Sequence, residues 1–172
     1  VRYADTTAND GNFVMRYAWR YRNYVIDALN RDLPYDAFIV EQIAGDLLPK
    51  TGQPSTDTRR TIATGFLMLG PKGLAEADKE QLRLDIADEQ LDVIGRGFMA
   101  LTISCARCHD HKFDPIPTQD YYSLAGILRG VEVLNGNTGP TSMWYEQSVD
   151  QYPAKQKAQL QSLRSVRDEL EV

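Results

Sequence analysis

The stretch from Lys79 to His109 carries the most regular apolar pattern in the chain, and it constrains the fold more than any other feature. Residues spaced by alternating steps of three and four lie on one face of an α-helix. The sequence therefore predicts a continuous helix over 79–109, with both cysteines of the chain on its apolar stripe. The residues of that stripe are Leu91, Ile94, Phe98, Leu101, Cys105 and Cys108.

Apolar spacing predicts four further helices, at residues 13–30, 34–48, 58–69 and 118–128. Pro34 begins the second of them, and Gly70-Pro71 is a strong stop signal for the third. The only stretch with a strand-like pattern is a weak one at 131–134. The expected fold class is therefore all-α. Inward positions in the first two helices include Tyr17, Tyr21, Val25, Phe38, Ile39, Ile43 and Leu47.

Three regions are expected along the chain. Residues 1–130 form a helical domain, and 131–152 form a loop region with several glycines. Residues 153–172 form a C-terminal helix whose narrow stripe suits half of a hairpin or a coiled coil. That stripe consists of Leu160, Leu163, Val166 and Leu170. The chain begins at Val1 without an initiator methionine, so we expect it to be an N-terminally truncated part of a longer polypeptide.

Composition excludes some partners. The net charge is -5 and there is no basic cluster, which argues against nucleic acid because nothing would displace counterions from phosphates. No apolar run approaches the roughly 20 residues needed to cross a bilayer. The sequence therefore predicts no membrane span in this chain.

The segment Cys105-Ala106-Arg107-Cys108-His109 is C-x-x-C-H, the attachment signature of c-type haem. Two cysteines three residues apart face the same way, so their sulfurs can add to the two vinyl groups along one edge of the porphyrin. The adjacent histidine then binds the iron. The motif predicts one covalent haem c, held by Cys105, Cys108 and His109, with His109 as metal ligand. The helical domain would fold around it.

Four other interpretations of the motif remain open. A disulfide between Cys105 and Cys108 would close a short, strained loop. A dithiol redox pair usually sits at a helix N-terminus, whereas this pair is expected near a helix end. A zinc site would need His109 and His111 as well, crowding four ligands into seven residues. The two cysteines could also be reduced core residues.

The sixth iron ligand is a separate question. His111 cannot readily bind the iron that His109 holds, because two residues of chain cannot pass around the porphyrin edge. Met143 follows His109 on a Gly/Pro-containing loop, and it is the predicted second metal ligand. Met68 is more often a core residue in such a context. An open iron position is the remaining alternative.

The run CARCHDHKFDPIPTQDYYSLAGIL at 105–128 resembles the planctomycete-type cytochrome c domain of unknown function, which is found in large secreted bacterial proteins. The resemblance extends through residues 2–6, 18–49, 63–76 and 88–115. It implies a haem-binding role. The residues that match the family pattern without change are Cys105, Cys108, His109, Asp110, His111 and Lys112. The segment GVEVL at 130–134 departs from that pattern where the family tends to have a basic run and a methionine.

The expected function is electron transfer by a c-type haem domain of a secreted bacterial protein. Because thioether bonds to haem are made outside the cytoplasm, the expected location is periplasmic or otherwise extracytoplasmic. The redox partner is a protein or domain that the sequence does not identify. One alternative is a haem enzyme with an open iron position, acting on peroxide, oxygen or a sugar-linked substrate. The other is a structural module that binds a non-haem metal.

Overall fold

A computed structural model of the chain describes residues 2–7, 14–15, 17–74 and 76–131. These residues form six α-helices and two short helical turns, and within them no strand occurs beyond an isolated antiparallel bridge between Thr6 and Val14. The all-α fold class is confirmed for the described part of the chain. The predictions for 131–152 and 153–172, including the weak strand at 131–134, lie almost wholly outside it. The helices are α1 (Ala18–Asn30), α2 (Tyr35–Ala44), α3 (Pro54–Ala63), α4 (Gly65–Met68), α5 (Lys79–Ile94) and α6 (Thr118–Arg129), with a π-helical turn η1 (Gly95–Met99) and a 3-10 turn η2 (Ile103–Arg107).

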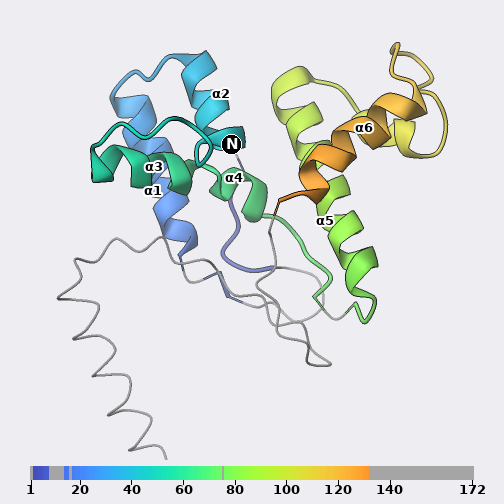
Figure 1. Ribbon diagram of the computed structural model, residues 1–172, viewed down its shortest axis with the longest axis horizontal. Coiled ribbons are helices and arrows are strands. Elements are labelled where there is room, and N and C mark those ends of the chain that lie inside the picture. The colour runs from blue at the N-terminus through green and yellow to red at the C-terminus, as the bar shows by residue number, and fades with distance from the viewer. Residues whose placement is uncertain (1, 8–13, 16, 75, 132–172) are drawn as a thin grey trace, which may run out of the picture.

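The helices form two groups (Figure 1). Helices α1 to α4 surround a first core, and α5, η2 and α6 surround a second core. The rings of Phe66 and Phe98, tilted by 44° with centroids 5.0 Å apart, join α4 of the first group to η1, which follows α5. The first core contains Met15, Ala18, Tyr21, Tyr24, Val25, Ala28, Phe38, Ala63, Phe66, Leu67 and Leu69. The second core contains Ala87, Leu91, Ile103, Ala106, Tyr121 and Leu128.

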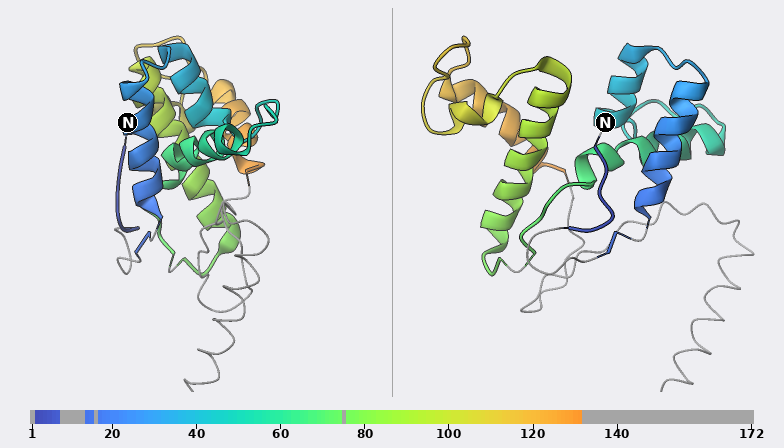
Figure 2. Two further views of the ribbon diagram at one scale, coloured as in Figure 1. Left: turned by 90° about the vertical axis from the view of Figure 1, so that its left-hand side faces the viewer. Right: turned by 180° about the vertical axis from the view of Figure 1, so that it is seen from behind.

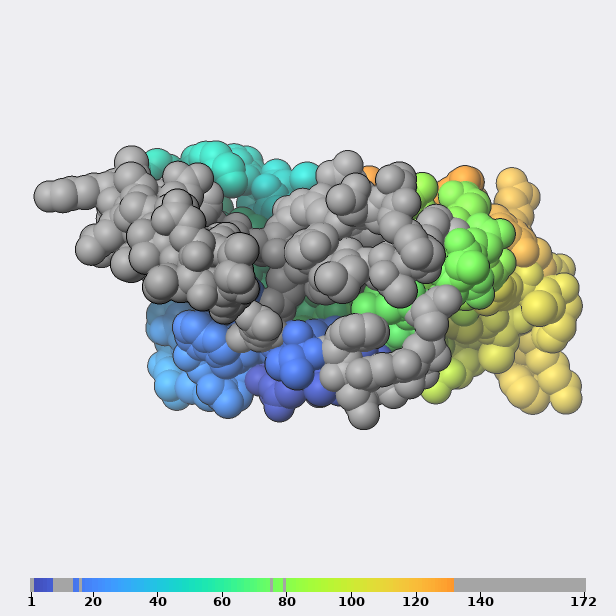
Figure 3. Space-filling model, turned by 90° about the horizontal axis from the view of Figure 1, so that it is seen from below, coloured from blue at the N-terminus to red at the C-terminus, as the bar shows by residue number. Residues whose placement is uncertain are grey.

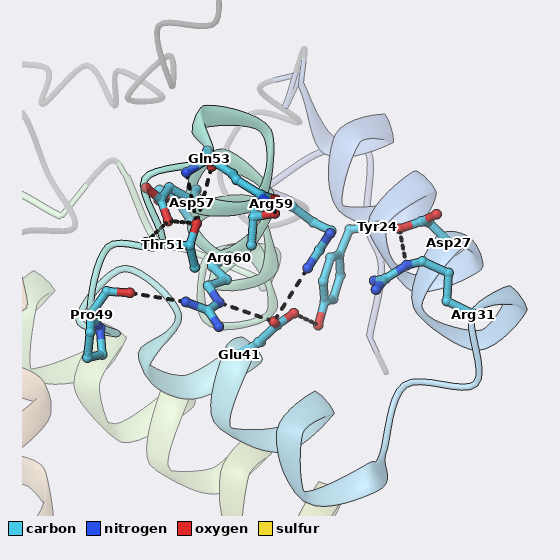
Figure 4. Close-up of polar contacts among 12 residues, drawn as sticks. Tyr24, Asp27, Arg31, Glu41, Pro49, Thr51, Gln53, Asp57, Arg59 and Arg60 are labelled. Atoms are coloured by element: carbon cyan, nitrogen blue, oxygen red, sulfur yellow. Dashed lines mark hydrogen bonds and ion pairs between the residues drawn. The ribbon is translucent and has the colours of Figure 1, made fainter.

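The buried carboxylate of Glu41 on α2 is satisfied by side chains from α1 and α3. Figure 4 shows the Tyr24 hydroxyl, at 3.1 Å, and the Arg60 guanidinium, at 3.4 Å, directed at the carboxylate of Glu41. Arg59 lies 3.9 Å from the same carboxylate. A buried carboxylate is costly unless it is paired and hydrogen-bonded. The network therefore explains how Glu41 is tolerated on the inner side of α2.

The short helix α4 ends against three side chains, two of which come from distant segments. The last carbonyls of a helix lack partners within it. Arg2 donates to the carbonyl oxygen of Phe66, Gln90 to that of Leu67, and Lys72 to that of Met68. Gln90 comes from α5 and Arg2 from the N-terminal segment, so the end of α4 links the two groups of helices.

The predicted helix over 79–109 is wrong beyond Ile94. Helix α5 ends there, the backbone continues through a π-helical turn, and Ala100 adopts a left-handed conformation with φ of 56°. The physical reason lies partly at Gly95, where a Cβ atom would sit 2.9 Å from the carbonyl oxygen of Leu101. The chain can fold back at this point only because residue 95 is glycine.

The other predicted helices exist with different limits. The helix predicted over 58–69 is two helices, α3 and α4, and the first two predicted helices are shorter than expected. Tyr17 lies before α1 and is 38% exposed, and Leu47 lies beyond α2 and is 80% exposed. Both were predicted to point inward, and both are exposed because the helix that would carry them does not include them.

Candidate functional site

The C-x-x-C-H segment lies on the outer side of the second group of helices. Figures 2 and 3 show its segment at the end of the molecule opposite α1 and α2. Cys105 lies inside η2, and Cys108 is the residue that follows it. The motif is thus carried by a separate turn rather than by the end of α5.

The turn η2 presents both thiols to solvent. In a 3-10 helix, side chains three residues apart lie along one edge. Ile103 and Ala106 form the inner edge and are packed in the second core, with 2% and no exposed surface. Cys105 and Cys108 form the outer edge, where both are exposed and unbonded. The two alternative interpretations of a disulfide and of a buried reduced pair therefore do not describe this conformation.

An aspartate on α5 fixes the turn to both long helices of this group. Asp88 accepts a hydrogen bond from the Arg107 guanidinium at 3.0 Å and another from the Tyr121 hydroxyl at 2.6 Å. The Asp88 carboxylate raises the pKa of Arg107, and burial raises the pKa of Tyr121. The hydroxyl of Tyr122 donates to the carbonyl oxygen of Arg107 at 3.1 Å. Arg107, inside the motif, is thus attached to α5 and α6 together.

His109 is exposed and has one nitrogen available. Its Nδ1 lies 2.7 Å from the carbonyl oxygen of Asp110. A carbonyl oxygen can only accept, so Nδ1 carries the proton and Nε2 retains its lone pair. Metal-binding histidines commonly donate their other ring N–H to a carbonyl in this way. His109 therefore has the tautomer and orientation of a ligand.

His111 has no nitrogen available. Its Nδ1 accepts the backbone N–H groups of Phe113 at 3.3 Å and Asp114 at 2.9 Å. In the neutral ring the proton is then on Nε2, which lies 2.9 Å from the hydroxyl oxygen of Thr102. The side chain of His111 is only 5% exposed. This arrangement agrees with the sequence argument that His111 does not bind the same iron as His109.

Thr102, His111 and Asp114 are arranged like a catalytic triad, but the proton is on the wrong nitrogen. The Asp114 carboxylate lies 3.2 Å from Nδ1 of His111. In a triad that nitrogen donates to the carboxylate, and Nε2 accepts the hydroxyl proton. Here Nδ1 is an acceptor for two backbone N–H groups, so Nε2 donates to Thr102 and leaves it unactivated.

The structure does not bring together the four residues of the alternative zinc site. Among the described residues, no three His, Cys, Asp or Glu side chains are grouped where they could hold a metal ion. Both ring nitrogens of His111 are also already hydrogen-bonded. Asp110 is used structurally, because its carboxylate accepts the backbone N–H of Thr118 at the start of α6.

The donor set fits a covalently bound haem better than a small ion. Two outward thiols and one free imidazole nitrogen lie within five residues, and the exposed Tyr122 donates its hydroxyl to the carbonyl oxygen of Arg107 between the two cysteines. A porphyrin needs this combination of two sulfurs for its edge, one nitrogen for its iron and an apolar surface for its face. The residues present therefore satisfy the attachment chemistry that the motif predicts.

The methionines are spread over the molecule. Met15 is buried in the first core, Met68 is half-buried on α4, and Met99 is 54% exposed at the end of η1. Met143 lies outside the described residues, so its role as second ligand stays a prediction. Met99 is no longer on the same helix as the motif, because the chain turns at Ala100.

Sequence reasoning placed Asp88 on an acidic, mostly solvated helix face and did not predict its contacts with Arg107 and Tyr121, nor the contact of Thr102 with His111. An aspartate on a mostly polar helix face gives no pattern that separates a clamp from a solvated residue. A signal for the turn did exist in Gly95 and Gly97, which weaken a helix by up to about 1 kcal/mol each relative to alanine. That signal marks where the helix ends, so that residues 103–107 can form the separate turn η2.

The fold and the site define a class: a small all-α domain that displays two cysteines and one histidine on an outer turn. The chain belongs to the PSCyt2 family (DUF1549), a cytochrome-like family described as proteins of unknown function, and the match spans residues 1–133. The predicted family resemblance is confirmed at this level, and the family description names no ligand or activity. Comparisons with curated proteins and with solved structures find no match.

Proposed function

We propose that this chain binds one haem c covalently through Cys105, Cys108 and His109, and that it transfers electrons in a secreted bacterial protein. The observation that carries the proposal is the turn η2 with its two outward thiols. His109 beside it presents a free Nε2. The family membership supports the same function but does not assign it.

Each residue has a separate task in this function. The thiol of each cysteine adds across one vinyl group, forming an S–C bond while the thiol proton goes to the other vinyl carbon. The carbonyl oxygen of Asp110 keeps the His109 proton on Nδ1 and thereby directs Nε2 outward. When bound, the haem supplies a one-electron iron couple whose potential depends on its axial ligands and burial.

The sixth position separates two forms of this function. With His111 held by Thr102 and Met15 buried in the first core, Met143 stays the proposed second ligand. A thioether ligand favours ferrous iron and electron transfer. If the position is open, the domain is a haem enzyme that activates peroxide or oxygen, or oxidises a sugar-linked substrate. Both ring nitrogens of His111 are already hydrogen-bonded and so do not fill the sixth position. This observation supports the haem enzyme as the second candidate.

The proposed location is periplasmic or otherwise extracytoplasmic, because haem attachment takes place there. The proposed redox partner is another protein or domain, including the remainder of a longer polypeptide. In the described part of the chain, no helix is long and apolar enough to cross a membrane.

Haem attachment is tested by producing the chain in a bacterium with a haem c maturation apparatus. We expect the visible absorption to remain with the protein after acid-acetone extraction, and intact mass to show one haem per chain. Replacing both Cys105 and Cys108 by alanine should abolish retention, whereas His109→Ala should leave thioether bonds but lose the low-spin spectrum. A wild-type chain without haem that instead binds a stoichiometric metal ion would favour the structural metal module.

The sixth ligand is tested by Met143→Ala with Met68→Ala as its matched control. We expect the far-red charge-transfer band of a methionine-ligated ferric haem in the wild type, and its loss in Met143→Ala only. The iron of that variant should then bind carbon monoxide readily. Loss of the band in Met68→Ala instead would move the ligand to α4, and rapid carbon monoxide binding by the wild type would favour the enzyme.

A further inference from the structure

Thr102 and His111 bracket the C-x-x-C-H motif. Nε2 of His111 and the hydroxyl oxygen of Thr102 are 2.9 Å apart, and all five residues of the motif lie between them in the chain. Their hydrogen bond closes residues 102–111 into a ring. A closed segment has fewer conformations available than an open one of the same length. The pair Thr102 and His111 is called the clasp below.

His111 also fixes the chain that follows the motif. Its ring accepts the backbone N–H groups of Phe113 and Asp114, and its own backbone N–H donates to the carbonyl oxygen of Ile116 at 2.9 Å. Ile116 packs against the second core. The imidazole of His111 therefore connects Thr102, which precedes the motif, with the loop after it, and the backbone of His111 connects the same loop to Ile116 on the core.

Burial divides the residues near the motif into two kinds. The three groups that would react or bind, on Cys105, Cys108 and His109, are exposed. The side chain of His111 is 5% exposed and both its nitrogens are engaged. A ligand must be reachable, whereas a residue that shapes a turn is best placed beneath it. His111 has the second set of properties.

We propose that His111 is a positioning residue: with Thr102 it holds the attachment turn in the conformation shown here before haem arrives. The part of this inference that concerns haem attachment rests on the proposed function. The two thiols must meet two vinyl groups at fixed separation, and an ordered turn avoids the loss of chain entropy at that step. The clasp would thus increase the fraction of protein molecules that present both thiols and the Nε2 atom of His109 in the same conformation.

The test compares two substitutions at Thr102. Thr102→Val keeps the shape of the side chain but removes the oxygen that His111 bonds, and Thr102→Ser keeps the oxygen. With haem maturation in the same cells, we expect Thr102→Ser to carry as much covalent haem as the wild type. Thr102→Val should carry less, by up to roughly tenfold, because loss of one neutral hydrogen bond lowers the equilibrium constant for the closed turn by about that factor. Far-UV circular dichroism should be the same for all three chains.

A second readout uses the apoprotein and needs no haem. We expect ring-nitrogen NMR shifts to show a proton on Nε2 of His111 and on Nδ1 of His109. Exchange of the Asp114 amide hydrogen should be slower in the wild type and Thr102→Ser than in Thr102→Val. His111→Phe, which keeps a ring without nitrogens, should resemble Thr102→Val or be worse in both readouts.

The outcomes separate the two proposals. If the wild type, Thr102→Ser and Thr102→Val carry equal amounts of covalent haem, the proposal that the clasp positions the turn is overturned. A wild-type chain that takes up no haem overturns the proposed function, and the apoprotein measurements then decide the clasp alone. In that case, equal exchange of the Asp114 amide in Thr102→Ser and Thr102→Val overturns it as well.

Discussion

Asp88 shows at the scale of a single residue how the motif is supported. One of its oxygens accepts from the Arg107 guanidinium and the other from the Tyr121 hydroxyl. Arg107 belongs to the motif and Tyr121 to α6, so one carboxylate on α5 determines where the turn η2 lies. The hydrogen bonds of Asp88 reach Arg107 and Tyr121, so Asp88 acts on the two thiols and on His109 through Arg107.

Replacing Asp88 by asparagine should destabilise the apoprotein by about 1–2 kcal/mol, because one amide NH₂ would face a donor and the charge would be lost. The matched control is Asp85→Asn, one turn earlier on α5. Asp85 lies 3.9 Å from Arg107 and is 49% exposed, so we expect less than about 0.5 kcal/mol. Urea unfolding of both variants measures the difference. A larger loss in Asp85→Asn would contradict the role given to Asp88.

At this scale the sequence displays the candidate site more directly than its support. Cys105, Cys108 and His109 are recognisable because haem attachment requires adjacent residues in a fixed order, which a linear sequence displays directly. The contact between Asp88 and Arg107 joins residues 19 positions apart. It depends on the path of the chain between them, and that path includes the break after Ile94 that the spacing did not predict.

The break between α5 and η2 is the main finding at the scale of the elements. The apolar stripe ends near it: Leu101 still packs against the second core, but beyond it Ile103 and Ala106 are buried, whereas Cys105 and Cys108 are exposed. Spacing by threes and fours therefore did not indicate the buried residues beyond Leu101, and it did not establish that the backbone stays helical. The element boundaries were least predictable where glycine permits a close return of the chain.

Ala100→Gly tests this break through the sign of its effect on stability. A left-handed conformation costs an L-residue roughly 1–2 kcal/mol, and glycine adopts it without that cost, although its unfolded state is more disordered. At a φ of 56° we expect Ala100→Gly to stabilise the apoprotein by about 0.5–1 kcal/mol. In a continuous helix the same substitution would destabilise it by about 1 kcal/mol.

The comparison is made by urea unfolding with Ala100→Val as the opposing variant. A β-branched side chain is disfavoured at positive φ, so Ala100→Val should be destabilised relative to the wild type. Ala100 is exposed, and neither substitution disturbs the core. A loss of stability in Ala100→Gly would support the continuous helix that the apolar spacing predicts.

At the scale of the whole molecule, the two groups of helices meet at the end of α4. Arg2 donates to the carbonyl oxygen of Phe66 and also pairs with Glu89 on α5. Lys72, which is 2% exposed, donates to the carbonyl oxygens of Met68 and Gly70. Two cations at the end of a helix suit the partial negative charge there, but burying an ammonium group opposes this gain.

Burial, together with the charge of Arg2, lowers the pKa of Lys72 to about 7 from an ordinary value of 10.5. Between these two values the unfolded chain holds the Lys72 proton and the folded chain has released it. Folding stability therefore rises as the pH increases from about 7 toward 10.5, and this group contributes no slope below that range. Over the whole range from about pH 7 to 10.5, the free energy of unfolding increases by on the order of 5 kcal/mol. Only part of this increase is reached by pH 9.5.

Urea unfolding of the apoprotein at several values between pH 6.5 and 9.5 measures this slope. We expect stability to increase with pH in the wild type and in Lys112→Met, which removes an exposed lysine. Lys72→Met keeps the length of the side chain without its ammonium group, so its stability should change less over the same interval. Tyr21, with a pKa of about 12, does not titrate within this interval in the folded chain, whereas Arg2, with a pKa of about 10, begins to release its proton at the upper end and adds to the slope there. If Lys72→Met and the wild type had the same slope, Lys72 would carry its charge in the folded chain throughout the interval. The carbonyl oxygens at the end of α4 would then outweigh the effect of burial, and the join between the two cores would be a charged one.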